Sequence, residues 1–210
     1  DSVESEQPEP EATLKPSEIA PSEPANETSS KDEVLSQPSA PLGLEPVSSD
    51  NVLIDGLSPL PSSELTEGTE RYVGPKAVGP MKLMASRAMA PLTPRDMIRV
   101  IYQLMFDEDQ KLGAAALRSF EALDDRILAA VLGEYLPPTI LLLLSRTLVK
   151  KSLYLERVLL NRNTPDEGFV FIGAHSEDPK ILAIVSANQE RMLRNHDIIR
   201  GLAGNLATLR

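Results

Sequence analysis

The feature that most constrains the fold of this chain is the helical spacing of its apolar residues from Leu92 to the end. In the first such run, Met97, Ile98, Ile101 and Leu104 fall on one face of a helix, because residues about one turn apart lie one above the other. No segment alternates apolar and polar residues with the period of a strand. The pattern therefore predicts an all-α fold for this part of the chain.

Capping residues and prolines mark where these helices begin. Ser, Thr, Asp and Asn side chains accept hydrogen bonds from free amides at helix starts, and Pro fits the first helical position. The run Ile140–Leu144 is apolar on nearly every side, so the helix that carries it should be buried on more than one face. The predicted helix starts are Thr93-Pro94, Asp107–Asp109, Asp124-Asp125, Pro137-Pro138 and about Ser152.

Three later apolar runs close on an asparagine, at Asn161, Asn188 and Asn205. Asn tolerates the left-handed backbone conformation that is common at helix C-termini, so we expect these residues to end helices in that conformation. Thr164-Pro165 and Asp178-Pro179 are each predicted to be a helix N-cap followed by Pro at the first helical position. The first two asparagines are 27 residues apart, enough for two short helices that must stack on their neighbours to bury their apolar faces.

This order of helix starts and stops resembles bacterial HEAT-like repeats, especially the leucine-rich-repeat variant type. The resemblance is close over about Val158–Asn205 and loose over Leu92–Leu160. It implies a right-handed α-solenoid of short antiparallel helix pairs over residues 92–210, used mainly for protein interaction. Some proteins of this type carry an iron–sulfur module, which a chain without cysteine cannot hold. The matching residues are Asn161, Thr164, Pro165, Asp178, Pro179 and Asn188.

Residues 1–65 differ sharply in composition from the helical region. The first 70 residues carry 16 acidic and 2 basic side chains, and the first 65 contain no aromatic residue. Such a stretch cannot bury enough apolar surface to offset about 1–2 kcal/mol per residue of ordering entropy. We therefore predict a disordered acidic arm rich in Ser, Pro and Glu. Residues 66–91 are predicted to be a linker with a possible short helix at Met81–Ala90, whose methionines pack on the first repeat.

One apolar island interrupts the arm, at Val52, Leu53, Ile54 and Leu57. It is either a chance cluster or a short linear motif that docks on a partner, as disordered segments often do. The sequence leaves both interpretations open.

A cluster of five basic residues is the second candidate site: Arg146, Lys150, Lys151, Arg157 and Arg162. Three interpretations are open. The cluster is a solvated polar face, a cradle for an acidic protein segment such as this chain's own arm, or a site for a nucleic-acid backbone. A net charge of only +4 over residues 71–210 and the lack of tryptophan favour the first.

No catalytic, cofactor or metal site is predicted. The chain has no cysteine, and His175 and His196 are 21 residues apart, a spacing that fits no known ligand motif. Acidic groups such as Asp107–Asp109 lie at predicted helix starts, where a negative charge stabilises the helix by interacting with its dipole. His175 is left without an assigned role.

These observations predict a non-enzymatic scaffold or adaptor that binds another protein through a helical-repeat surface, with the acidic arm as a tether. The alternative is an electrostatic nucleic-acid-binding protein that uses the Arg146–Arg162 cluster. The lack of cysteine fits a reducing compartment, so a cytoplasmic location is predicted. The longest near-apolar run, Leu136–Leu144, is too short to span a membrane. The chain starts with Asp rather than Met, which suggests a fragment of a longer protein, and its partner and oligomeric state stay open.

Overall fold

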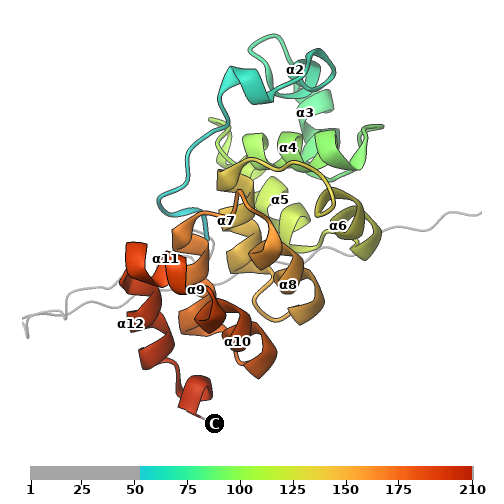
Figure 1. Ribbon diagram of the computed structural model, residues 1–210. Coiled ribbons are helices and arrows are strands. Elements are labelled where there is room, and N and C mark those ends of the chain that lie inside the picture. Colours follow the sequence, from blue (N-terminus) through green and yellow to red (C-terminus); the bar gives the residue numbers. More distant parts are fainter. Residues whose placement is uncertain (1–52, 210) are drawn as a thin grey trace, which may run out of the picture. The chain divides into compact units, whose positions relative to one another are not determined.

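The computed structural model describes residues 53–209, and this part of the chain is helical (Figure 1). It holds eleven α-helices, two 3-10 helices and, within the described residues, no β-strand. The all-α prediction is therefore confirmed for these residues. Of the predicted disordered arm, residues 1–65, residues 1–52 lie outside the described range, whereas residues 53–65 are described and include η1 and the buried Leu60. The elements are η1 (Ser62–Glu64), α2 (Glu67–Val73), α3 (Gly79–Ser86), α4 (Pro94–Leu104), α5 (Gln110–Glu121), α6 (Asp125–Val131), α7 (Pro138–Thr147), α8 (Ser152–Leu160), α9 (Asp166–His175), α10 (Pro179–Ala187), α11 (Gln189–Arg194), α12 (Asp197–Gly204) and η2 (Leu206–Leu209).

Most helix starts follow the predicted chemistry. At α4 the Thr93 hydroxyl accepts a hydrogen bond from the Asp96 amide at 3.2 Å, and Pro94 occupies the first helical position. The same kind of cap satisfies free amides at the starts of α5, α6 and α10. The capping residues there are Asp109, Asp124 and Asp178.

The start of α9 differs from the prediction by one residue. Pro165 is the N-cap and the helix begins at Asp166, so the Thr164 side chain does not cap it. The Thr164 hydroxyl instead donates to the Val158 carbonyl in the last turn of α8. Thr164 is buried, and a buried hydroxyl needs a hydrogen-bond partner, which explains why the side chain turns toward α8.

Asn161, Asn188 and Asn205 end α8, α10 and α12 as predicted, but the predicted left-handed conformation is wrong. Their φ angles are −75°, −86° and −87°. Each side-chain oxygen accepts a hydrogen bond from a backbone amide two or three residues later. Asparagine therefore serves here through its side-chain acceptor, which closes a local turn, and not through its backbone freedom. The donating amides belong to Asn163, Arg191 and Ala207.

Residues 66–91, predicted as a linker with one short helix, hold two helices, α2 and α3. Pro80 lies in the first turn of α3, where its missing amide proton breaks no helical hydrogen bond. The inner face of α3 is made by the small residues Ala85 and Ser86, which are fully buried. The predicted packing of the larger apolar side chains is therefore only partly right. Met81 is half-buried, but three other large apolar side chains are exposed, namely Leu83, Met84 and Met89.

The end of α3 places Ala88 in the left-handed region, with φ of 57°. The Ala88 amide donates to the Ala85 carbonyl and the Met89 amide donates to the Met84 carbonyl, both at 3.0 Å. These two bonds form a Schellman motif, in which the left-handed position is usually glycine. A side chain at that position costs about 1–2 kcal/mol, because Cβ crowds the following carbonyl.

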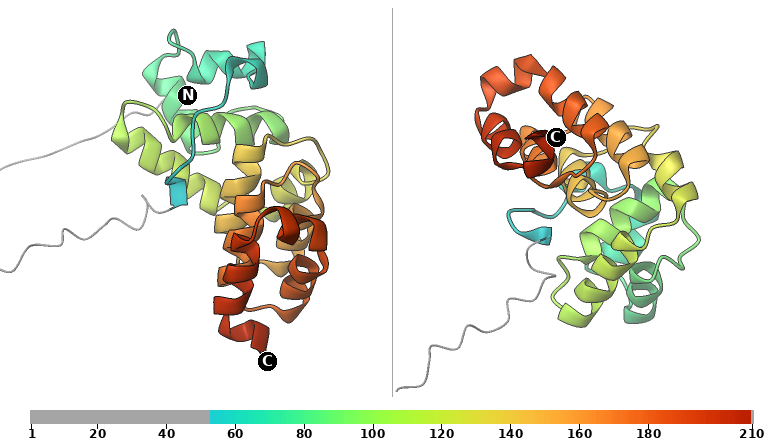
Figure 2. Two further views of the ribbon diagram at one scale, coloured as in Figure 1. Left: turned by 60° about the vertical axis from the view of Figure 1, so that its left-hand side comes forward. Right: turned by 90° about the horizontal axis from the view of Figure 1, so that it is seen from below.

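The described helices form an N-terminal group, α2–α6, and a C-terminal group, α7–α12 (Figures 1 and 2). Their buried apolar residues form one core cluster. Among the N-terminal helices, α4 packs against α2, α3, α5 and α6. Among the C-terminal helices, α9 packs against α7, α10 and α12, and α8 packs against α7 and α10. The prediction that the apolar helix is buried on more than one face is confirmed, because α7 has no exposure at Ile140, Leu141, Leu143 and Leu144.

An arginine lies inside the N-terminal helices. Arg99 of α4 is 2% exposed, and its Nη2 donates to Glu64 Oε2 at 3.1 Å. The Tyr135 hydroxyl donates to the other Glu64 oxygen at 3.1 Å, and this bond raises the pKa of Tyr135. Within residues 53–208, Arg99 Nε has no hydrogen-bond partner. The buried guanidinium therefore depends on Glu64 for charge compensation.

The helices α9 and α12 approach each other closely at glycines. A Cβ built on Gly201 of α12 would lie 2.9 Å from the Val170 carbonyl oxygen and 3.3 Å from the Ala174 amide nitrogen, both in α9. In the other direction, a Cβ on Gly173 of α9 would lie 3.4 Å from the Leu202 side chain. Glycine lets the two backbones come together here because no side chain stands between them.

Candidate protein-interaction site

The predicted docking motif contacts the helical domain of its own chain. Leu53, Ile54 and Leu57 are half-buried against the core, and Val52 lies outside the described residues. The Leu57 amide donates to the Ile54 carbonyl at 3.0 Å and closes a turn in which Gly56 has φ of 70°. Glycine adopts a positive φ of this kind without strain, because it has no Cβ.

Arg146 joins the two candidate sites that the sequence suggested separately. This residue of the predicted basic cluster lies in α7, and its Nη1 donates to the carbonyls of Leu53 and Asp55, both at 2.7 Å. Hydrogen bonds from a charged donor are stronger than neutral ones. The structure therefore brings Arg146 to the backbone of the docking motif.

Two residues of α4 hold the next part of the same segment. The Tyr102 hydroxyl donates to the Ser58 carbonyl at 2.8 Å, and Gln103 Oε1 accepts from the Leu60 amide at 2.8 Å. Burial raises the pKa of Tyr102, so its hydroxyl stays protonated and remains a donor. Four hydrogen bonds thus fasten residues 53–60 to α4 and α7, and all four use the backbone of the segment.

Of the other four residues of the basic cluster, two contact groups of their own domain. Lys151 pairs with Asp125 at 3.5 Å on the surface, and Arg157 Nη1 donates to the Ala129 carbonyl at 3.4 Å. Exposed pairs of this kind contribute little to stability. Two cluster residues are exposed, and their side chains form no hydrogen bond or ion pair with another residue of the described part: Lys150 and Arg162.

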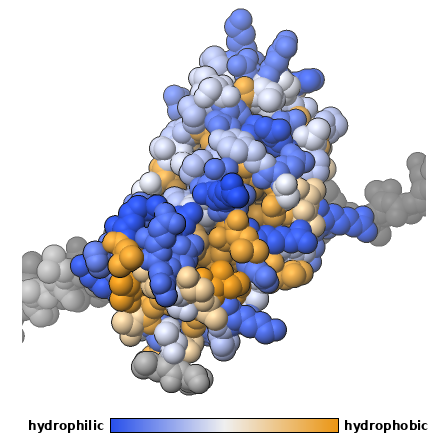
Figure 3. Space-filling model, in the orientation of Figure 1, coloured by the Kyte–Doolittle hydropathy of each residue, from blue (hydrophilic) through white to orange (hydrophobic). Residues whose placement is uncertain are grey.

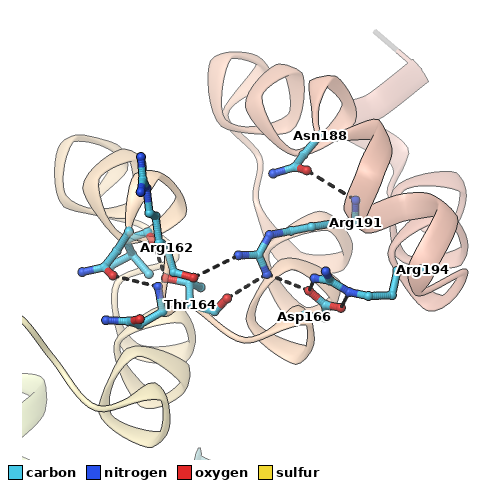
Figure 4. A network of polar contacts seen from close by, with 9 residues as sticks. Arg162, Thr164, Asp166, Asn188, Arg191 and Arg194 are labelled. Carbon is cyan, nitrogen blue, oxygen red and sulfur yellow. Dashed lines mark hydrogen bonds and ion pairs between the residues drawn. The ribbon is translucent and has the colours of Figure 1, made fainter.

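Asp166, at the start of α9, joins two arginines of α11 (Figure 4). Its Oδ1 accepts from Arg191 Nη1 at 2.6 Å and from Arg194 Nη2 at 2.7 Å, and its Oδ2 accepts from Arg194 Nε at 2.9 Å. The hydrogen bond from Arg194 is the main cause that lowers the pKa of Asp166; partial burial opposes it, and Arg191 adds to it. The carboxylate therefore stabilises the fold at neutral pH, and this contribution is lost as the pH falls below about 4 toward the lowered pKa of the folded state.

Arg191 also binds the loop that connects α8 and α9. Its guanidinium donates to the Thr164 carbonyl at 2.8 Å and to the Arg162 carbonyl at 3.4 Å (Figure 4). The same group lies 4.4 Å from the centre of the Phe169 ring, a cation–π distance. Its donors are used by the chain's own acceptors, so we assign this network to the packing of α11 and not to ligand binding.

Two exposed leucines give α8 an apolar outer surface. Leu153 and Leu160 are 65% and 68% exposed and lie seven residues apart, which places them on one face of the helix. Figure 3 shows apolar surface over α8 and α10, and beside it the surface over α11, which is hydrophilic apart from the exposed Leu193. The starts of α8 and α10 lie close enough for the Ser152 side chain to lower the pKa of Asp178. We call the exposed leucines and the adjoining surface of α10 the α8–α10 face.

His175, which had no assigned role, makes local contacts at the end of α9. Its ring stacks on Phe171, with the ring centres 4.2 Å apart and the planes 18° apart. Its Nδ1 lies 2.9 Å from the Phe171 carbonyl oxygen and donates to it when it carries the proton. Both contacts are therefore made to the preceding turn of its own helix.

The described residues contain no grouping of three or more His, Asp or Glu side chains that could hold a metal ion. No helix in this range has the length and apolar character required to cross a membrane. Comparison of the chain with protein-family models, curated proteins and solved structures finds no match.

Sequence reasoning missed both the α8–α10 face and the groups that hold residues 53–60. A signal existed for the first, because α8 carries Leu153 and Leu160 as well as a buried apolar face made by other residues. No signal marked Tyr102 and Gln103, since their partners are backbone groups 44 and 43 residues away.

Proposed function

We propose that the chain is a non-enzymatic protein–protein interaction scaffold or adaptor, and that its partner binds the α8–α10 face. The observation that carries the proposal is the exposure of Leu153 and Leu160 on one side of α8. Exposed apolar side chains that form a contiguous patch mark interaction sites more often than single ones do. Residues 1–52 stay a predicted acidic tether.

The packing of the C-terminal helices supports a repeat arrangement, which we propose to be HEAT-like. In chain order, α7 and α8 form one pair and α9 and α10 the next. The first members, α7 and α9, pack against each other, and so do the second members, α8 and α10. Stacked repeats of this type present neighbouring helices as an extended binding surface.

The α8–α10 face fits a helix of the partner. An amphipathic helix that presents apolar residues at positions i, i+3 or i+4 and i+7 can lie along two neighbouring helices, with its apolar residues against theirs. Glu156 and Arg157 both lie between Leu153 and Leu160 on α8 and are exposed, so this face offers the partner no net charge. The proposed partner is therefore a protein with an amphipathic helix that docks through its apolar side.

Nucleic-acid binding is not favoured by the positions of the basic residues. Arg146 and Arg157 donate to backbone carbonyls of their own chain, and Lys151 pairs with an acidic residue. A nucleic-acid site requires several free cations that follow the phosphates together.

The test compares the full chain with the double variant Leu153→Ser/Leu160→Ser. Each chain captures partners from an extract of its source cells, and the captured protein is then purified and its affinity for each chain is measured. We expect the double variant to bind at least about tenfold more weakly, because burial of one leucine contributes about 1.5–3 kcal/mol.

The matched control is Val78→Ser/Met89→Ser, which removes two large apolar side chains that are 55% and 68% exposed on a different part of the domain. It should bind like the unmodified chain. Equal affinity of all three chains for the purified protein would refute the α8–α10 face. Binding to duplex DNA at low salt that weakens as salt rises would favour the nucleic-acid alternative instead.

A further inference from the structure

The segment of residues 53–60 is held in the way in which proteins bind peptides. Its four hydrogen bonds to the helical domain all use backbone groups, namely three carbonyls and one amide. Its apolar side chains Leu53, Ile54 and Leu57 are half-buried and Leu60 is buried in the core, whereas Asp55 and Gly56 are exposed. Backbone hydrogen bonds combined with a few apolar contacts are typical of peptide recognition.

The groups that receive the segment belong to helices that are packed independently of it. Tyr102 and Gln103 lie on α4, which packs against α2, α3, α5 and α6. Arg146 lies on α7, which packs against α8 and α9. Since these helix–helix contacts do not use the segment, we expect α4 and α7 to stay packed when the segment leaves.

We propose that α4 and α7 carry a peptide-binding site, that residues 53–60 are its resident ligand, and that a turn peptide of a partner protein with the same chemistry can replace them. The ligand class follows from the contacts. Two apolar residues precede an acidic residue and a glycine, and a third apolar residue follows. The glycine allows the turn, and the turn presents two carbonyls, two residues apart, to Arg146.

The glycine provides a selective way to empty the site. A Cβ at Gly56 would meet no atom within 4 Å, so a larger residue there has space but faces a φ of 70° that it rarely adopts. Gly56→Val therefore disfavours the turn without a clash with the helical domain. This proposal does not involve the α8–α10 face, and each of the two can fail without the other.

The experiment uses the full chain and a fluorescent peptide with the sequence of residues 51–61, NVLIDGLSPLP. Fluorescence anisotropy measures peptide binding to the unmodified chain and to Gly56→Val. We expect the variant to bind the peptide about tenfold or more tightly than the unmodified chain, because the resident segment blocks the site in the latter for at least about nine-tenths of the time.

Two controls separate recognition from nonspecific adhesion. Adding Arg146→Met to Gly56→Val should weaken peptide binding at least about tenfold, since two charge-assisted hydrogen bonds are lost. A peptide that carries Val in place of Gly56 should bind at least about tenfold more weakly than the parent peptide, because it disfavours the same turn. Far-UV circular dichroism confirms that each chain keeps its helices.

Three results would overturn the proposal. The first is a folded Gly56→Val chain that does not bind the peptide. The second is binding that Arg146→Met leaves unchanged. The third is unchanged hydrogen-exchange protection of the Leu57 and Leu60 amides in Gly56→Val, because the turn would then not be what the site recognises. If Gly56→Val does not fold, Leu53→Ser/Ile54→Ser empties the site by removing apolar contacts, and the same peptide measurement decides.

Discussion

The helices α2–α6 and the helices α7–α12 are joined by polar contacts of different sequence range. In the N-terminal group, Lys82 pairs with Asp107 over 25 positions, but Arg99 reaches Glu64 over 35 and Tyr135 reaches the same carboxylate over 71. In the C-terminal group, Asp166 binds Arg194 over 28 positions. The C-terminal value is close to the 27 residues between Asn161 and Asn188, so contacts there join one helix pair to the next.

This difference shows two ways to build a helical domain. The C-terminal helices use contacts that recur between neighbours, together with close backbone approach at glycines. The N-terminal helices depend on single side chains that cross to distant, irregular segments. A substitution should therefore destabilise the two groups for different reasons. In the N-terminal group the reason is loss of a charge partner, and in the C-terminal group it is loss of close packing.

Glu64→Ala should give the largest effect, because it leaves the buried Arg99 guanidinium without a counter-charge. We expect the free energy of unfolding to fall by about 3 kcal/mol, measured by denaturant titration with circular dichroism. Glu67→Ala, which removes an exposed carboxylate nearby, should stay within about 0.5 kcal/mol of the unmodified protein. Addition of Arg99→Met to Glu64→Ala should restore part of the loss, and a double variant weaker than Glu64→Ala would contradict the charge explanation.

Gly201→Ala tests close packing in the C-terminal group. Its Cβ would meet backbone atoms of α9 that cannot rotate away, so we expect a loss of about 2 kcal/mol in unfolding free energy. Gly204→Ala on the same helix is the matched control, because a Cβ there meets nothing within 4 Å. The control should be neutral or stabilising by up to about 1 kcal/mol. Equal effects of both substitutions would show that α9 and α12 do not need the glycine.

Ala88→Gly should have the smallest effect and the opposite sign. The N-terminal group places an alanine in a left-handed conformation where glycine fits better, so the substitution should stabilise the protein by about 1 kcal/mol. The gain is partly offset by the greater freedom of glycine in the unfolded chain. Thermal unfolding should show a raised midpoint, and a lowered one would mean that the Ala88 side chain contributes packing that exceeds its backbone strain.

The helix starts and ends could be predicted from the sequence because they depend on residues that are close together in the chain. Asp124 and Asp178 cap the helices that follow them, and both were predicted from that chemistry. The conformation predicted for Asn161 was wrong because two properties of asparagine both suit a helix end. One is its tolerance of positive φ, and the other is its side-chain hydrogen-bond acceptor. Sequence alone does not decide between them.

The candidate sites were harder to predict because they depend on which distant groups meet. The sequence marked Leu53, Ile54 and Leu57 as either a chance cluster or a docking motif, and Arg146 as part of a basic cluster. Their contact spans 93 positions between Leu53 and Arg146, and no local pattern indicates it. The other residues of the basic cluster have only their charge and their closeness in sequence in common. Charge alone did not show which of them contact groups of their own domain.

The position of Arg146 has a mechanical consequence. A pull on the chain N-terminal to Leu53 reaches the helical domain first at the bonds from Arg146 of α7, then at Tyr102 and Gln103 of α4. These bonds lie in sequence along the segment, so they would break one after another and not all together. The four hydrogen bonds of the segment would therefore take up the force in steps before it reached α2. The helices that follow the segment in the chain would be loaded only after these bonds had broken.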